Sequence, residues 1–191
     1  MSKVILDPQP RKIEDIFYNS TKKTLYSSHR VIEFNGKDRN RFYNEHIEDT
    51  DFIIGQPDLD STFVERSKKL KAVFNIEGNF LPNIDYKACY LKGIRILTPS
   101  SVFAVPVAEL AIGMMISLAR GIHTSHGDFV NGKELYGLEG NTESELISGT
   151  ELGFIGFGDL GKAIYNLVQG FRPTIRVFDP WLTSSYLLRE G

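Results

Sequence analysis

The sequence contains little cysteine, little excess charge of one sign and no long uninterrupted apolar run. Its single cysteine, Cys89, cannot form a disulfide within the chain, which is typical of a reducing compartment. A formal net charge of -2 provides no electric field that would attract nucleic acid or an anionic membrane. The amino-terminal stretch "MSKVILDPQPRK" has too short an apolar run for the core of a signal peptide. We therefore expect a cytoplasmic protein without a nucleic-acid partner.

The longest apolar stretch, Val102 to Ala119, contains Pro106 and Glu109, so we expect no membrane span. Low-complexity tracts and internal repeats are also missing from the sequence. What is present is an ordinary globular composition, with 41% hydrophobic and 24% charged residues. A chain of 191 residues can form one large domain or two small ones.

Short apolar runs of strand length alternate with helix-like segments over the first 98 residues. The five apolar runs are "KVIL" (3–6), "HRVIEF" (29–34), "DFII" (51–54), "KAVFNI" (71–76) and "RIL" (95–97). Strands that alternate with helices, and that are apolar almost throughout, predict a parallel sheet covered on both faces. We therefore expect one α/β domain over residues 1–98.

Three segments between these runs are predicted to be helical, namely residues 10–19, 60–70 and 83–93. In the second segment Asp60 or Ser61 can cap the amino terminus, and Lys68 and Lys69 lie near the expected end, where the helix dipole favours cations. In the third, an aspartate at position 85 can act as the cap and a glycine at position 93 as the terminator.

A long helix is predicted over residues 102–120. Its apolar positions keep helical spacing on one face, and further apolar residues fill the other sides. We expect such a helix to be buried on more than one side, as an ordinary core helix or as an element between two domains or subunits. Its place after a finished α/β unit favours the second interpretation. The polar, glycine-bearing stretch 133–150 that follows is predicted to be a surface loop.

The stretch "GFIGFGDLG" (153–161) has four glycines in nine positions, between a predicted strand (151–156) and a predicted helix (159–170). Three of them, Gly156, Gly158 and Gly161, form the pattern G-x-G-x-x-G of dinucleotide-binding proteins. We expect Gly156 to allow a tight turn, Gly158 to let a pyrophosphate approach the backbone, and Gly161 to let the helix pack close to the strand. The alternative is a glycine-rich turn of some other α/β protein.

Two further features support the dinucleotide interpretation. The amides of Asp159 and Leu160 open the predicted helix and can point at the phosphates, while the Asp159 side chain is expected to point to solvent. The next predicted strand, 174–179, ends in Asp179, which lies 18 positions past the last glycine of the pattern. A carboxylate there can accept hydrogen bonds from the adenosine ribose and repel a 2′-phosphate, so we expect NAD rather than NADP.

The histidines and the cysteine are weaker candidates for a functional site. His123 and His126 have the spacing of one helix face but no third ligand nearby, so they are interpreted as surface residues rather than a metal site. His29 and His46 have no partner that the sequence identifies. Cys89 lies among helix residues and is expected to pack in the core.

The sequence resembles the D-isomer-specific 2-hydroxyacid dehydrogenases, which include the phosphoglycerate dehydrogenases. The resemblance is weak over the first 50 residues and strong from about residue 70. It is carried by "VFNIEGNFLPNID" (73–85), "KGIRILTPSS" (92–101), "AVPVAELAIGMMISLAR" (104–120), "ELGFIGFGDLGKAI" (151–164) and "VFDP" (177–180). It implies an α/β fold with a flavodoxin-like substrate-binding domain at 1–98, followed at 99–191 by an interdomain helix and the first part of a Rossmann NAD-binding domain.

The resemblance also implies site residues and an assembly. The family's loop that holds the substrate carboxylate through backbone amides corresponds to Glu77, Gly78 and Asn79. The region 102–120 contributes to a two-fold dimer in the family, so a homodimer is expected. The chain departs from the family where Phe80 replaces a second glycine and Ile76 a frequent basic residue. A third departure is an aspartate at position 159, where the family tends toward basic or polar residues.

Hydride transfer at a 2-hydroxy acid requires an acid/base, a carboxylate that orients it and a cation for the substrate carboxylate. In the family these are a histidine, a glutamate and an arginine that follow the strand ending in the ribose-binding aspartate, whereas this sequence stops twelve residues past Asp179. We therefore expect no catalytic residue within the chain. The resemblance implies an amino-terminal portion, or truncated product, of an NAD-dependent dehydrogenase for a small 2-hydroxy or 2-keto acid, inactive by itself. The alternatives are a non-catalytic NAD-sensing or interaction protein of this fold, like the related co-repressors, and a different NAD enzyme with a related domain.

Overall fold

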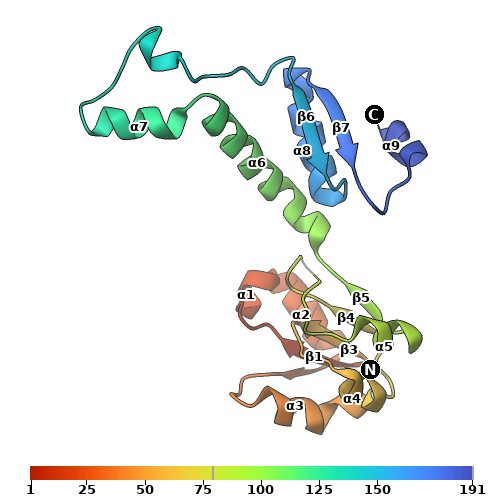
Figure 1. Cartoon of the computed structure of the whole chain (residues 1–191). Helices are drawn as coiled ribbons and strands as arrows, with labels where there is room; N and C mark the ends of the chain where they lie inside the picture. Colours follow the sequence, from red (N-terminus) through yellow and green to blue (C-terminus); the bar gives the residue numbers. More distant parts are fainter. Residues whose placement is uncertain (79, 191) are drawn as a thin grey trace. The chain divides into compact units, whose positions relative to one another are not determined.

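A computed structural model describes residues 1–78 and 80–190, and the chain divides into two compact units, Met1–Pro99 and Ser100–Gly191 (Figure 1). The first unit contains a five-stranded sheet in which all neighbouring strands are parallel. Its strands are β1 (Lys3–Asp7), β2 (Arg30–Glu33), β3 (Phe52–Gly55), β4 (Ala72–Phe74) and β5 (Arg95–Leu97). The strand order β2-β1-β3-β4-β5 is that of the flavodoxin-like doubly wound sheets. All five predicted strands are therefore present.

The helices of the first unit follow the prediction only in part. They are α1 (Ile13–Ile16), α2 (Asn19–Ser28), α3 (Arg39–His46), α4 (Ser61–Arg66) and α5 (Tyr86–Leu91), with a 3-10 turn η1 (Ile47–Asp49) after α3. The predicted caps are confirmed, because the side chains of Asp60 and Asp85 accept hydrogen bonds from the amides of Phe63 and Ala88. Gly93 follows α5 with a φ of 74°, as expected for a helix terminator.

Two helix expectations were wrong, and two helices were missed. The predicted single helix over 10–19 is interrupted, because Phe17 and Tyr18 have extended backbone that separates α1 from α2. The α4 helix ends at Arg66, so Lys68 and Lys69 lie beyond it rather than in its last turn. The helices α2 and α3 were not predicted at all. Their sequences are mostly polar, and only Tyr43 of the two helices is buried.

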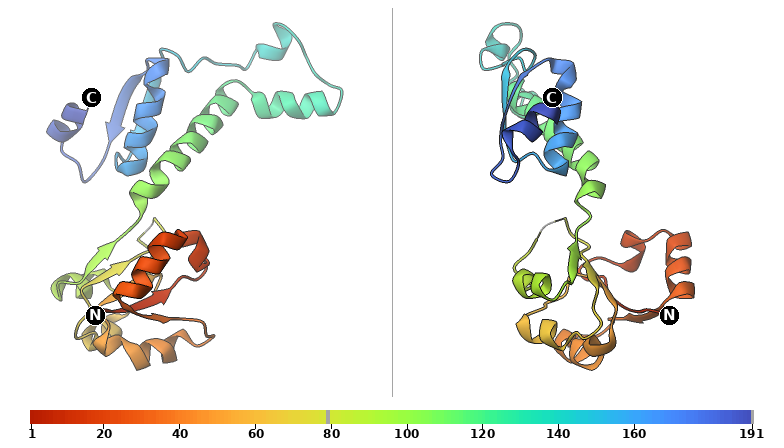
Figure 2. Two further views of the ribbon diagram at one scale, coloured as in Figure 1. Left: turned by 180° about the vertical axis from the view of Figure 1, so that it is seen from behind. Right: turned by 90° about the vertical axis from the view of Figure 1, so that its right-hand side faces the viewer.

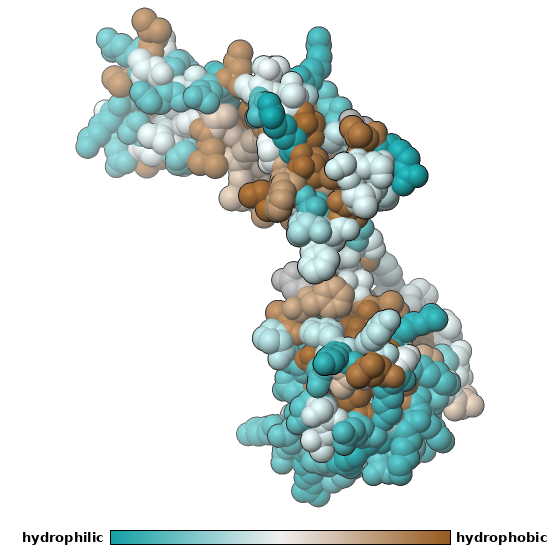
Figure 3. Space-filling view, turned by 45° about the vertical axis from the view of Figure 1, so that its right-hand side comes forward, coloured by the Kyte–Doolittle hydropathy of each residue, from teal (hydrophilic) through white to brown (hydrophobic). Residues whose placement is uncertain are grey.

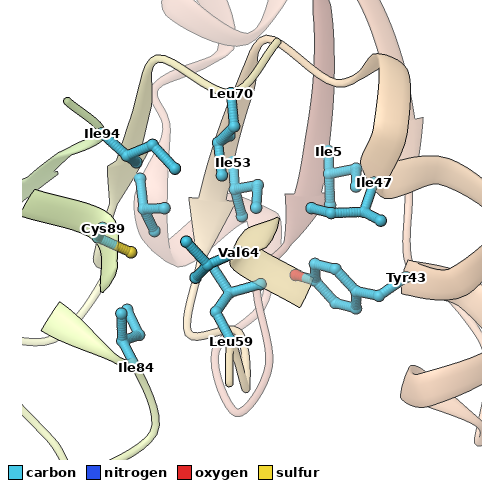
Figure 4. Close-up of a cluster of buried hydrophobic side chains, with 11 residues drawn as sticks. Ile5, Tyr43, Ile47, Ile53, Leu59, Val64, Leu70, Ile84, Cys89 and Ile94 are labelled. Atoms are coloured by element: carbon cyan, nitrogen blue, oxygen red, sulfur yellow. The ribbon is translucent and has the colours of Figure 1, made fainter. Parts of the chain in front are cut away.

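The core of the first unit lies between the sheet and α3, α4 and α5 (Figure 4). Ile5, Ile53 and Val73 supply it from the three central strands. The helices α1 and α2 lie on the other side of the sheet (Figure 2), and all five residues of β1 are buried. Cys89 in α5 is fully buried, and this burial raises the pKa of its thiol. The cysteine is therefore a packing residue, as predicted.

The second unit is built around one β-α-β element. It contains α6 (Ser100–Ala119), α7 (Ile122–Val130), η2 (Glu139–Asn141), β6 (Glu151–Ile155), α8 (Asp159–Val168), η3 (Gln169–Phe171), β7 (Thr174–Phe178) and α9 (Ser184–Glu190). The strands β6 and β7 are parallel neighbours, and α8, which connects them, packs against α6. The predicted loop 133–150 has one 3-10 turn and neither strand nor α-helix. The helices α7 and α9 were not predicted.

The surface of α6 differs from the expectation. Only Ala104 and Ala108 of this helix are buried within the chain, so the interpretation as an ordinary core helix was wrong. Burial of this helix against a second subunit stays a prediction. Apolar side chains are accordingly exposed on this unit (Figure 3). The α6 helix is long and apolar enough to cross a membrane, and 11% of its most apolar stretch is buried within the structure. One such helix is weak evidence for a membrane span, because core helices of soluble proteins can have the same length and composition.

Candidate functional site

The glycine pattern forms the turn between β6 and α8. Gly156 has a φ of 89°, a left-handed conformation that residues with a side chain adopt only with strain, and its amide donates a 2.7 Å hydrogen bond to the carbonyl of Phe178. A Cβ on Gly161 would lie 2.9 Å from the carbonyl oxygen of Gly156, so a side chain there would push α8 away from the turn. A Cβ on Gly158 would meet nothing within 4 Å, because this residue faces open space.

A cavity of about 740 Å³ lies against this turn, and it is lined by Gly156, Gly158, Asp159, Leu160 and Gly161 together with residues of β6 and α6. The first bond inside α8 runs from the amide of Lys162 to the carbonyl of Gly158. The amides of residues 159–161 precede that bond, as the unpaired amides at the start of any α-helix do. A helix amino terminus with such amides attracts anions. The turn therefore has the geometry of a phosphate cradle.

The carboxylate of Asp159 stands beside this cradle. It is exposed, but it does not simply point to solvent, because its Oδ2 accepts a 2.6 Å hydrogen bond from the hydroxyl of Ser100 in the first turn of α6. Ser100 therefore holds a negative charge close to the place where phosphates would bind.

We predict that Asp159→Asn strengthens NAD binding several-fold. The substitution removes a negative charge next to the pyrophosphate and keeps a side-chain oxygen for the Ser100 hydroxyl. Calorimetric titration of the chain with NAD measures the change. Glu151→Gln, at the start of β6 and away from the turn, is the matched control and should leave the affinity unchanged. An affinity that falls in Asp159→Asn would show that the carboxylate supports the site rather than opposing the cofactor.

Asp179 connects the end of β7 to the glycine turn. Its Oδ2 accepts a 2.8 Å hydrogen bond from the amide of Phe157, which lies between Gly156 and Gly158. Its Oδ1 accepts hydrogen bonds of 2.8 and 3.1 Å from the amides of Trp181 and Leu182. These backbone hydrogen bonds, that of Phe157 first, hold the pKa of the Asp179 carboxyl below its usual range. An ionised carboxylate has about four acceptor positions, so one remains for a ribose hydroxyl.

The anchoring of the turn by Asp179 is a role that sequence reasoning missed. The position of an acidic residue after the second strand predicts a ribose contact, but it says nothing about a bond to the residue inside the glycine pattern. The carboxylate reaches the turn because the end of β7 and the turn after β6 are adjacent in the sheet. Its contact with the ribose stays a prediction.

The predicted substrate loop follows β4 in the first unit. Glu77 and Gly78 are half-buried there, and Asn79 lies outside the described residues. The guanidinium of Arg11 binds the Glu77 carboxylate through both oxygens, with Nε to Oε1 at 2.6 Å and Nη2 to Oε2 at 3.0 Å. This pairing lowers the pKa of Glu77 and raises the pKa of Arg11. Arg11 was not predicted, because it lies 66 positions from its partner and carries no local motif.

The histidines lie away from both sites. His29 directly precedes β2, and the carbonyl of His46 accepts a hydrogen bond from Lys3 at the start of β1, so both lie at the amino edge of the first sheet. Glu77 lies at the opposite, carboxyl edge. His123 and His126 lie on α7. Among the described residues no group of three or more histidine, cysteine, aspartate or glutamate side chains can hold a metal ion.

A parallel β-α-β unit with a glycine turn after its first strand, and an acidic residue after its second, defines a dinucleotide-binding domain. Residues 112–189 match the family described as "D-isomer specific 2-hydroxyacid dehydrogenase, NAD binding domain". The chain belongs to the D-isomer-specific 2-hydroxyacid dehydrogenase family, as the sequence motifs implied.

Similar proteins of known sequence and structure agree with this assignment. Hydroxypyruvate reductase of Thermotoga maritima is 32% identical over 149 residues, which are 72% of this chain and 47% of that protein. D-3-phosphoglycerate dehydrogenase of Methanocaldococcus jannaschii is 29% identical over 144 residues, which are 72% of this chain and 26% of that protein. A phosphoglycerate oxidoreductase from Rhizobium etli superposes with a TM-score of 0.84 at 39% identity, covering 100% of this chain and 60% of that one. The chain therefore spans less than half of the length of the Thermotoga and Methanocaldococcus relatives.

The matched domain binds NAD, so NAD is the cofactor of the second unit. The residues of this structure fit it. The turn has open space at Gly158, a conformation at Gly156 that requires glycine, and a helix amino terminus that faces the cavity. The carboxylate of Asp179 adds an ionised acceptor at the end of the neighbouring strand.

Proposed function

We propose that this chain supplies the NAD-binding part and the substrate-carboxylate-binding part of a dehydrogenase that interconverts a 2-hydroxy acid and a 2-keto acid. The observation that carries the proposal is the glycine turn held by Asp179 through the Phe157 amide, in a chain of this family. When bound, NAD would supply the acceptor for the hydride that leaves C2 of the hydroxy acid, while the hydroxyl proton would pass to a base. Gly158 leaves room for the pyrophosphate, and the amides of Asp159 and Leu160 donate to it. Asp179 accepts from the ribose.

The first unit is proposed to bind the substrate. The loop of Glu77, Gly78 and Asn79 would donate its backbone amides to the substrate carboxylate. Arg11 supports this role because it neutralises the Glu77 side chain, which would otherwise repel an anion. The pairing of Glu77 with Arg11 also connects Glu77 to the segment that follows β1, and this connection restrains the Glu77 side chain.

The second candidate function is a non-catalytic NAD-sensing protein. The observation in its favour is that each of the four histidines lies away from the candidate site of its own unit. Titration with NAD and then with a 2-hydroxy acid separates the two functions. Binding of both ligands supports the dehydrogenase, and binding of NAD alone supports the sensor. A chain that binds neither would contradict both.

We also propose a homodimer formed through α6, because its exposed face is strongly apolar. Leu110, Met114 and Leu118 are 63%, 57% and 67% exposed and recur at every fourth position. Met115, by contrast, lines the cavity beside β6 and is a poor site for testing the interface.

We predict that Met114→Glu shifts a dimer toward monomer, because a charge buried between two apolar faces has no partner. Light scattering of the purified chain measures the mass before and after substitution. Lys133→Glu in the loop after α7 is the control and should leave the mass unchanged. A monomer in the unsubstituted protein would count against the proposed dimer.

A further inference from the structure

A second polar site lies at the carboxyl edge of the first sheet. Asp7 ends β1 and Gln56 follows β3, and these two strands are neighbours. In a sheet with this strand order, ligands bind at the carboxyl ends of the strands where the order reverses, between β1 and β3. A cavity of about 370 Å³ is found there, and its lining includes Arg39, Gln56, Asp58 and Asn83.

Gln56 is the unusual residue of this cavity. It is 9% exposed, and neither its Nε2 nor its Oε1 has a hydrogen-bond partner among the described residues. The Oδ1 of Asn83 is also buried without a partner there, while its Nδ2 donates to the carbonyl of Pro57. A buried amide is costly when its donor and acceptor are unpaired. The cavity therefore offers one complete amide and one further acceptor to a ligand that can hydrogen-bond.

The charges around the cavity restrict what that ligand can be. Asp7 is fully buried, and its Oδ1 accepts a 3.0 Å hydrogen bond from Nη2 of Arg39, while its Oδ2 accepts a 3.2 Å hydrogen bond from the Tyr43 hydroxyl. Nε of Arg39 lies 2.8 Å from the same Oδ2 as an ion pair. The guanidinium of Arg39 is thus already paired, and that of Arg11, next to the cavity residue Pro10, is paired with Glu77. Asp58 adds a further carboxylate. The charged residues that line the cavity are Arg39 and Asp58, and the guanidinium of Arg39 is already paired with Asp7. The cavity therefore has no excess positive charge for a phosphate, which carries close to two negative charges.

We propose that Gln56, with Asn83, binds an uncharged hydrogen-bonding group, a hydroxyl, at the far end of the substrate. The inference rests on the proposed function, in which the loop after β4 holds the substrate carboxylate. Gln56 follows β3, and β3 and β4 are adjacent parallel strands whose carboxyl ends lie at one edge. Neighbouring strands lie about 4.8 Å apart, a distance that a short hydroxylated acid spans. The substrate class is therefore a hydroxylated, unphosphorylated 2-hydroxy acid.

Three acids that differ only at C3 test this inference, namely D-lactate, D-glycerate and D-3-phosphoglycerate. We expect the NAD-loaded chain to bind D-glycerate about 3- to 10-fold more tightly than D-lactate, the effect of one added hydrogen-bonded group. D-3-phosphoglycerate should bind no more tightly than D-glycerate. In NMR titrations all three should shift the Gly78 amide, and D-glycerate should also shift the side-chain amide of Gln56.

The variant Gln56→Leu should reduce the affinity for D-glycerate to that for D-lactate and leave D-lactate binding unchanged. Retained D-lactate binding shows that the unit is still folded. Gln169→Leu is the matched control, since the exposed amide of Gln169 donates to the carbonyl of Tyr165 in its own helix region. This control should change neither affinity.

Equal affinities for D-lactate and D-glycerate, with a shifted Gly78 amide, would overturn the inference and leave the proposed function intact. Gln56 would then bind only water. Tighter binding of D-3-phosphoglycerate than of D-glycerate would overturn it as well. If no acid shifts the Gly78 amide although NAD binds, the proposed substrate loop fails together with the inference.

Discussion

The 191-residue chain should show no measurable oxidation of NADH with any 2-keto acid, although it should bind NAD. The reduction requires a group that protonates the keto oxygen as the hydride arrives, and losing such a general acid–base costs about 10²–10⁴ in rate. Losing the cation that anchors the substrate carboxylate lowers the rate further. With both reductions in rate combined, we expect turnover by the chain to fall below the detection limit of an ordinary spectrophotometric assay.

The positions of the histidines are the first reason for this expectation. His29 and His46 lie at the amino edge of the first sheet, while the candidate substrate loop lies at its carboxyl edge. His123 and His126 lie on α7, and the ring of His123 contacts the carbonyl of Ser117 and the hydroxyl of Thr124 next to it. No histidine among the described residues is placed to reach the Glu77 loop or the glycine turn within its own unit.

The arginines at the carboxyl edge give the second reason. Arg11 and Arg39 are each bound through both carboxylate oxygens of an acidic residue, Glu77 and Asp7 respectively. A substrate carboxylate would have to compete with these pairs, so neither guanidinium is ready to anchor it.

The assay follows NADH absorbance with pyruvate, glyoxylate and hydroxypyruvate as substrates. Hydroxypyruvate reductase of Thermotoga maritima, assayed in parallel, shows that the conditions support turnover. NAD binding to the chain, measured by calorimetry, shows that the protein is folded and active in binding. Turnover at a rate comparable to that of the Thermotoga enzyme would contradict the prediction, and substitution of each histidine by alanine would then identify the responsible group.

The sheets and the glycine turn could be predicted from sequence because their signals are local. Each strand is a short apolar run, and in β1, a central strand, all five residues are buried, so the run itself is the evidence. The turn depends on a few residues within one loop. Gly156 requires glycine because of its positive φ, and Gly161 because a Cβ there would lie too close to the carbonyl oxygen of Gly156. The helix caps at Asp60 and Asp85 are local as well.

The features that could not be predicted depend on partners far away in the sequence. The α2 helix has no buried residue and α3 has one, so neither carries the apolar periodicity that identifies a helix. The pairs of Arg11 with Glu77 and of Arg39 with Asp7 join residues 66 and 32 positions apart. The buried amide of Gln56 is recognisable only once the surrounding segments are in place, because glutamine in a loop is usually exposed.

Asp179→Ala should lower the affinity for NAD about 10-fold or more and narrow the preference for NAD over NADP. Two contributions are lost together. The ribose loses a charged acceptor, and the glycine turn loses the bond from the Phe157 amide that holds it against β7. The affinity for NADP should fall less, because the carboxylate that repels its 2′-phosphate is also removed. Because the pKa of Asp179 lies below its usual range, the carboxylate is ionised throughout neutral pH, and its contribution is lost only as the pH falls through that lowered pKa.

Asp179→Asn removes the charge and keeps the size of the side chain. The amide oxygen of asparagine can still accept from Trp181 and Leu182, but its NH2 group would face the Phe157 amide, so the turn is released in this variant too. Hydrogen exchange of the Phe157 amide should therefore accelerate in both variants, and in Asp128→Ala, a control on α7, it should not. Calorimetric titration with NAD and NADP gives the affinities. Equal affinities for NAD and NADP in the unsubstituted chain would rule out Asp179 as the ribose acceptor, whereas unchanged exchange at Phe157 would rule out its role in holding the turn.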